Sequence, residues 1–127
     1  MMATIAAVAY AVLMTITVLF QFCLAIGLPW GAASMGGKYS GKYPLNMRIV
    51  SLFNMIILSG ILIIVLAKAD IVFSQMKKFS MTAIWFVVAF SAVAAVLNII
   101  TPSKIERQIW APVTVIQLIA SIVVALD

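Results

Sequence analysis

The stretch TIAAVAYAVLMTITVLFQFCLAIGL, residues 4–28, contains no charged side chain, and its length decides the fold. At a rise of about 1.5 Å per residue, about 20 helical residues cross the ~30 Å hydrocarbon core of a bilayer. Since lipid offers no hydrogen bonds, every backbone N–H and C=O must find a partner within the protein, which a helix provides. The sequence therefore predicts that residues 4–28 form a transmembrane helix.

Three further segments meet the same criteria, residues 45–67, 79–100 and 105–126, with charged side chains only in the first turns of the second and fourth predicted helices. Alternating ten-residue segments typical of a transmembrane β-barrel do not occur. We therefore predict an all-α integral membrane protein with a single transmembrane domain, residues 1–127. Its four helices would form an antiparallel, up-down bundle.

The composition supports this class of protein. Of the 127 residues, 66% are apolar and 9% are charged, whereas a soluble domain usually carries about 25% charged residues. The net charge of +5 comes from basic residues scattered over short connections, which is typical of contacts with lipid headgroups rather than with nucleic acid. Histidine is absent and Cys23 is the single cysteine, so His-dependent triads and His/Cys metal or haem sites within one chain are excluded. We expect no catalytic residue, no metal and no cofactor.

The connections predict which segments share a side of the membrane. Both termini and the 68–78 connection would lie on one side, and the 29–44 loop and the 101–107 turn on the other, which we call the loop face. Five of the eight basic residues belong to the loop face, namely Lys38, Lys42, Arg48, Lys104 and Arg107. The positive-inside rule then places the loop face in the cytoplasm and both termini outside.

Small residues and prolines indicate how the helices are arranged. Ala3, Ala7 and Ala11 form a stripe of small residues that allows close helix packing, either within the bundle or in an oligomer. Pro44 precedes Arg48 by four residues and Pro102 precedes Arg107 by five. The chain could therefore consist of two related helical hairpins, although the match is too short to establish a repeat.

Beyond its first turn, each predicted helix carries one side-chain amide, and these four amides lie in the half of the bundle near the loop face or at its boundary: Gln21, Asn54, Asn98 and Gln117. Two interpretations are open, because polar groups within a membrane are costly and need a partner. The amides could hydrogen-bond between helices, or they could line a polar cleft that opens at the loop face. In the second case Arg48 and Glu106 would form an ion pair at its mouth, while Trp30, Trp110 and Arg107 would act as interfacial anchors.

The loop itself is rich in glycine, since residues 27–48 hold five of the six glycines. Glycine permits positive φ and close backbone approach. The loop could fold down as a lid over the cleft, with backbone amides facing inward, or it could be a mobile interfacial segment.

Several short motifs follow one another along the chain: Gly27-Leu28-Pro29-Trp30-Gly31, Gly36-Gly37, Pro44, Arg48, Asn98, Thr101, Ser103, Glu106-Arg107 and Pro112. In these motifs the sequence resembles a widespread group of small bacterial four-helix integral membrane proteins that have no assigned activity. Members often carry tryptophan directly before the glycine pair, where this sequence has Met35. The resemblance implies the four-helix fold and a location in the bacterial cytoplasmic (inner) membrane.

These patterns favour a non-enzymatic membrane protein whose polar cleft near the 29–44 loop binds or passes a small molecule or a lipid headgroup. Two alternatives stay open, a structural or accessory subunit of a larger membrane complex and an oligomeric channel. The expected partners are membrane lipids, together with further copies of the chain or a larger membrane protein, and not nucleic acid.

Overall fold

The computed structural model describes all 127 residues, with four long helices and no strand. The helices are α1 (Met2–Ala25), α2 (Leu45–Lys68), α3 (Lys77–Ile100) and α4 (Lys104–Leu126), and the connections contain three short 3-10 turns, η1 (Gly31–Ala33), η2 (Met35–Gly37) and η3 (Ser74–Met76). All four long helices are long and apolar enough to cross a membrane. The all-α architecture of an integral membrane four-helix bundle is thus confirmed.

α1 ends at Ala25, three residues before the predicted end of the span. Gly27 adopts a φ of +98°, and its N–H bonds to the carbonyl of Leu24, while the N–H of Leu28 bonds to the carbonyl of Cys23. This is a Schellman motif, in which a left-handed glycine satisfies the last carbonyls and turns the chain out of the helix. Apolar residues continue past this point, which explains why hydropathy alone placed the end too late.

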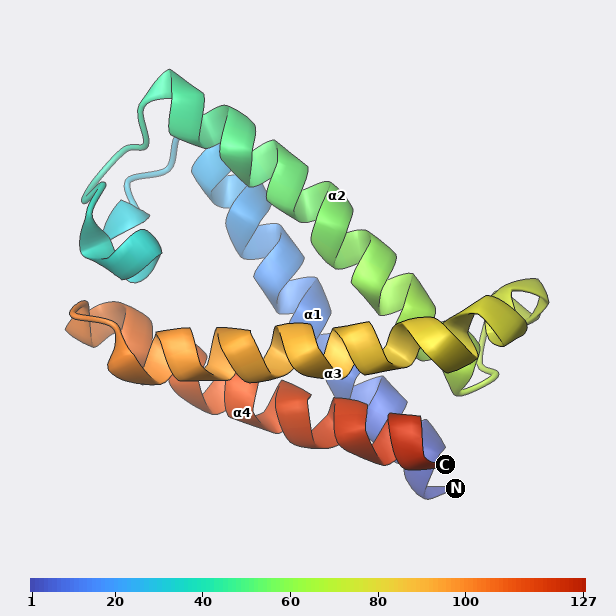
Figure 1. Cartoon of the computed structure of the whole chain (residues 1–127). Coiled ribbons are helices and arrows are strands. Elements are labelled where there is room, and N and C mark those ends of the chain that lie inside the picture. The colour runs from blue at the N-terminus through green and yellow to red at the C-terminus, as the bar shows by residue number, and fades with distance from the viewer.

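The helices form two hairpins that cross (Figure 1). α1 packs along α2, α3 packs along α4, and α1 also lies against α4, whereas α2 and α3 diverge from their connection toward the loop face. The main core fills the other half of the bundle and contains eleven buried residues: Ala7, Tyr10, Met14, Leu58, Ile61, Val65, Ile84, Val87, Ala120, Val124 and Ala125. The hairpins are therefore held together near the chain termini and separate at the loop face.

Several small residues pack inside the bundle, and many large apolar residues face outward. Ala3, Ala7 and Ala95 are buried within the bundle, so these small residues serve packing inside the chain. Large apolar side chains, Phe53 and Phe86 among them, are exposed on all four helices. A surface of this kind is suited to lipid rather than water.

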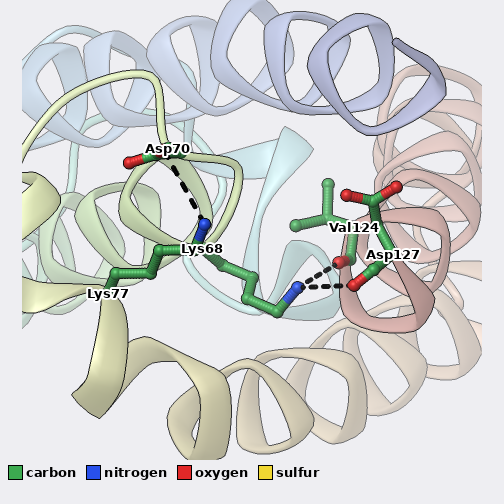
Figure 2. Close-up of polar contacts among 5 residues, drawn as sticks. All are labelled: Lys68, Asp70, Lys77, Val124 and Asp127. Carbon is green, nitrogen blue, oxygen red and sulfur yellow. Dashed lines mark hydrogen bonds and ion pairs between the residues drawn. The ribbon is translucent and has the colours of Figure 1, made fainter.

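Three basic side chains bind the carbonyl ends of helices. Arg48 Nε donates to the carbonyl of Ala25 at 2.8 Å, and Arg107 Nη1 donates to the carbonyl of Thr101 at 2.9 Å. At the opposite end, Lys68 Nζ reaches the carbonyls of Val124 and Asp127 at 3.1 and 3.3 Å (Figure 2). A helix C-terminus carries partial negative charge, so a cation there is favourable. Each hairpin is thus closed at the loop face by an arginine from its second helix.

Candidate functional site

A cavity of about 640 Å³ lies between the two hairpins, in the half of the bundle near the loop face. All four helices contribute to its wall, together with residues 33–36 and the turn between α3 and α4. Met14 and Leu58 belong both to the cavity wall and to the main core, so the floor of the cavity is the top of the core. Hydrophobic side chains make up 12 of the 23 lining residues, which makes the cavity amphipathic.

All four predicted amides line this cavity. Asn54 Nδ2 donates to Gln21 Oε1 at 3.5 Å, which is a long bond between α2 and α1. Asn98 Nδ2 instead donates to the carbonyl of Ala94 in its own helix at 2.7 Å. Only one weak bond therefore ties two helices through these amides.

Gln117 differs from the other amides because its Nε2 is buried and has no hydrogen-bond partner in the chain. The residue is only 6% exposed, and it lines the cavity. Leaving a buried donor unpaired costs about 1–3 kcal/mol. Gln117 thus places a buried donor without a protein partner in the wall of the cavity.

One face of α4 presents most of the chemistry. Glu106, Trp110, Thr114 and Gln117 follow at spacings of four, four and three residues, and all four are buried and line the cavity. This spacing places them on a single face of the helix. The rise from Glu106 to Gln117 is about 16 Å along the axis, so the stripe runs from the loop face toward the middle of the bundle.

Trp110 was predicted to be an interfacial anchor, and this prediction is wrong. The residue is only 8% exposed, and the centroid of its ring lies 4.9 Å from the ring centroid of Phe20 inside the bundle. The sequence interpretation missed Phe20, Trp110 and Thr114 as lining residues, although the helical spacing from Glu106 to Gln117 could have identified the two on α4. Trp30, by contrast, is exposed, and its ring stacks on the ring of Phe20 with the two centroids 6.4 Å apart.

Glu106 occupies the third position of α4 after the capping residue Ser103, whose hydroxyl accepts from the Glu106 N–H. In a capping box the glutamate would return to the N–H of the capping residue. Here Thr101 Oγ1 accepts from that N–H instead, and both carboxylate oxygens of Glu106 accept from the N–H of Gly36 at 3.3 and 3.5 Å. The carboxylate is therefore turned away from its own helix, toward the loop and the cavity.

The predicted Arg48–Glu106 pair does not form. Arg48 lies over the end of α1, bound to Ala25, and it does not line the cavity. The carbonyls at the end of α1 attract a cation, and they belong to the same hairpin as Arg48. Arg48 therefore binds them rather than Glu106. Arg107 is exposed and bound to Thr101, so its role at lipid headgroups stays a prediction.

Residues 31–37 form a lid that docks on the turn between α3 and α4. Ser103 Oγ donates to the carbonyl of Ala32, and Gly36 N–H binds Glu106. The approach needs Gly36 and Gly37, whose φ angles are +67° and +77°, and a Cβ on Gly37 would lie 3.3 Å from Ser103 Cβ. Of the two interpretations of the loop, the structure contains the folded lid.

Most of the exposed part of the cavity wall lies on α2 and α3, although Met35 and Pro102 at the loop face are also exposed. Its residues on α2 and α3 include Ile57, Val93 and Leu97, which are all exposed, whereas the lining residues on α1 and α4 are buried or half-buried. The two helices that carry these residues, α2 and α3, diverge toward the loop face (Figure 1). The lid thus covers part of the predicted opening at the loop face, and most of the exposed wall lies on the side of α2 and α3, toward the position of lipid.

The site combines amide and hydroxyl groups, one carboxylate and an apolar wall. Ligand pockets typically have this composition, with a few polar groups that orient a molecule held by apolar contacts. An amphipathic molecule could satisfy both kinds of surface at once. Comparison of the chain with protein-family models, with curated proteins and with solved structures found no match.

Proposed function

We propose that this protein is a non-enzymatic membrane protein that binds a small amphipathic molecule, a lipid or a compound of similar size, in the cavity beneath the lid. The observation that carries the proposal is the Gln117 amide, which lies in the wall of the cavity and whose buried Nε2 has no partner from the chain. A purely structural amide would be expected to bond to a neighbouring helix. This donor instead suits an acceptor oxygen of a ligand.

The size and the lateral opening support the same proposal. A volume of about 640 Å³ falls within the range of about 300–1,000 Å³ found for small-molecule sites. An exposed rim of apolar side chains on α2 and α3 suits a molecule that arrives through the bilayer. Water-soluble ligands would have to pass the docked lid.

Native mass spectrometry of the protein, gently extracted from its own membrane, tests the proposal. We expect one copy of the chain to retain one specific small molecule or lipid of defined mass. A bare protein, or a protein bound only to a larger membrane protein at fixed stoichiometry, would overturn it and favour an accessory subunit.

Replacing Asn54 or Gln117 with leucine should abolish retention of that molecule and change stability little. Leucine matches the volume of the amides but offers no hydrogen bond, and Gln117→Leu also removes an unpaired buried donor, which is neutral or stabilising. We expect the free energy of unfolding to change by less than about 1 kcal/mol. The measurements are ligand mass and equilibrium unfolding in mixed micelles. A loss of stability without any change in bound mass would mean that the amides only tie helices together.

For the location we propose the bacterial cytoplasmic membrane, with the loop face in the cytoplasm and both termini outside. The excess of basic residues on the loop face, five against three, supports this orientation. In a Cys23→Ser background, a membrane-impermeant maleimide applied to intact cells should label Ser74→Cys and spare Ser40→Cys. Both serines are exposed in connections on opposite sides, so the reverse labelling pattern would invert the topology.

A further inference from the structure

Glu106 is the one charged side chain in the wall of the cavity. Glu106 is only 8% exposed. No lysine or arginine forms an ion pair with it, and the ion pair in the structure joins Lys77 to Asp70. The single N–H of Gly36 serves both carboxylate oxygens at long distances. A carboxylate offers about four acceptor positions, so most of its capacity is unused.

Buried carboxylates need compensation, and the chain supplies it only in part. The first turn of α4 favours an anion, and the Gly36 N–H adds one bond. Buried charges are otherwise paired or neutralised. What the wall lacks is a cation.

Aromatic rings lie beside this carboxylate. Trp110 follows Glu106 by one turn on the same face of α4, a separation that brings side chains within about 5–6 Å at their Cβ atoms. Phe20 packs against Trp110 with ring centroids 4.9 Å apart, and both rings line the cavity. Aromatic faces attract cations, most strongly organic cations that carry little hydration.

Building on the proposed function, we infer that the ligand of this cavity is a lipophilic organic cation that enters from the bilayer between α2 and α3. Its positive group would pair with Glu106 and lie against Trp110 and Phe20. Its apolar part would fill the space above Met14 and Leu58. The basic residues of the loop face are all absent from the wall, so an anionic headgroup would find no counter-charge inside.

Three probes of similar shape and different charge test the inference. Tetraphenylphosphonium is a permanent cation, tetraphenylborate is its anionic counterpart, and triphenylphosphine oxide is neutral with an acceptor oxygen. Binding to the purified full chain is measured by calorimetry, with protein-free micelles subtracted to remove partitioning. We expect the phosphonium to bind at least tenfold more tightly than the borate.

Glu106→Gln isolates the charge, because glutamine keeps an acceptor for Gly36 and nearly the same shape. We expect this variant to lose at least tenfold in phosphonium affinity and to bind the phosphine oxide within twofold of wild type. Asp70→Asn is the matched control, since it removes one negative charge from an exposed site and should change neither affinity.

The outcomes separate this inference from the proposed function. Equal binding of phosphonium and borate by the wild type overturns the cation inference even if Glu106→Gln does not fold. If the Glu106→Gln variant still binds the phosphonium more tightly than the borate, the cation inference is overturned as well. In either case, phosphine oxide binding that is lost in Gln117→Leu leaves the proposed function standing. Absence of binding by all three probes overturns the inference, and a bare protein in native mass spectrometry would overturn the proposed function separately.

Discussion

Gly31→Ala should destabilise the folded protein by about 3 kcal/mol, the largest effect expected for any glycine in the chain. A Cβ at Gly31 would overlap the carbonyl oxygen of Tyr39 and lie 2.7 Å from that of Gly41. Both obstacles are backbone atoms, so no side chain can move aside. The N–H of Gly31 also bonds to the Gly41 carbonyl at 2.9 Å, which closes the loop on itself. Relief of the overlap would have to open the loop and pull the lid off the α3–α4 turn.

Two other glycines provide controls for this effect, measured by equilibrium unfolding in mixed micelles. A Cβ at Gly41 or at Gly60 meets nothing within 4 Å. Gly41 has a φ of +81°, so Gly41→Ala should lower the free energy of unfolding by about 1 kcal/mol, the strain of an alanine in the left-handed conformation. Gly60 lies within α2 with ordinary helical geometry, so Gly60→Ala should be neutral or slightly stabilising. Equal stabilities of Gly31→Ala and Gly60→Ala would show that the lid is not docked as described.

Val93→Trp should reduce ligand binding at least tenfold with little change in stability. Val93 lines the cavity on α3 and is 59% exposed at the lateral opening, so an indole ring there would obstruct the gap to α2. Because the side chain is not packed in the core, the larger ring need not strain the fold. The measurement is retention of the native ligand in mass spectrometry, together with the affinity of triphenylphosphine oxide.

Val96→Trp is the matched control for this experiment. Val96 is 54% exposed on the same helix, nearly as much as Val93, but it is not part of the cavity wall. The Val96→Trp variant should therefore bind ligand like the wild type. If both variants bind normally, access does not run between α2 and α3, and a route past the lid is the remaining path.

The depth of the polar groups was predictable from the sequence, because a helix rises by a fixed distance per residue. Counting from the helix ends placed Gln21, Asn54, Asn98 and Gln117 in one half of the bundle, and all four line the same cavity. Which side of the bundle is open could not be obtained in this way. It depends on the angle between the two hairpins, which is determined by packing in the opposite half.

The two incorrect predictions have separate physical causes. Tryptophans near helix ends usually lie at the membrane surface, and this general preference outweighed the spacing that places Trp110 on the same face as Glu106 and Gln117. The sequence predicts that Arg48 pairs with Glu106, the one acidic residue expected on the loop face, whereas its partner is the backbone carbonyl of Ala25. Every helix ends in such carbonyls, so side-chain patterns alone do not reveal them as competitors.

The contacts of the lid have a consequence for the order in which the chain assembles during synthesis. Arg48 bonds to Ala25, only 23 residues earlier, so the first hairpin can close as soon as α2 has been inserted. Ser103 and Glu106 bind residues about 70 positions earlier, so the lid has no docking partner until α4 has left the ribosome. α4, which is made after the other three helices, therefore completes the site. A nascent chain halted within α3 would hold a formed hairpin with its glycine loop still undocked.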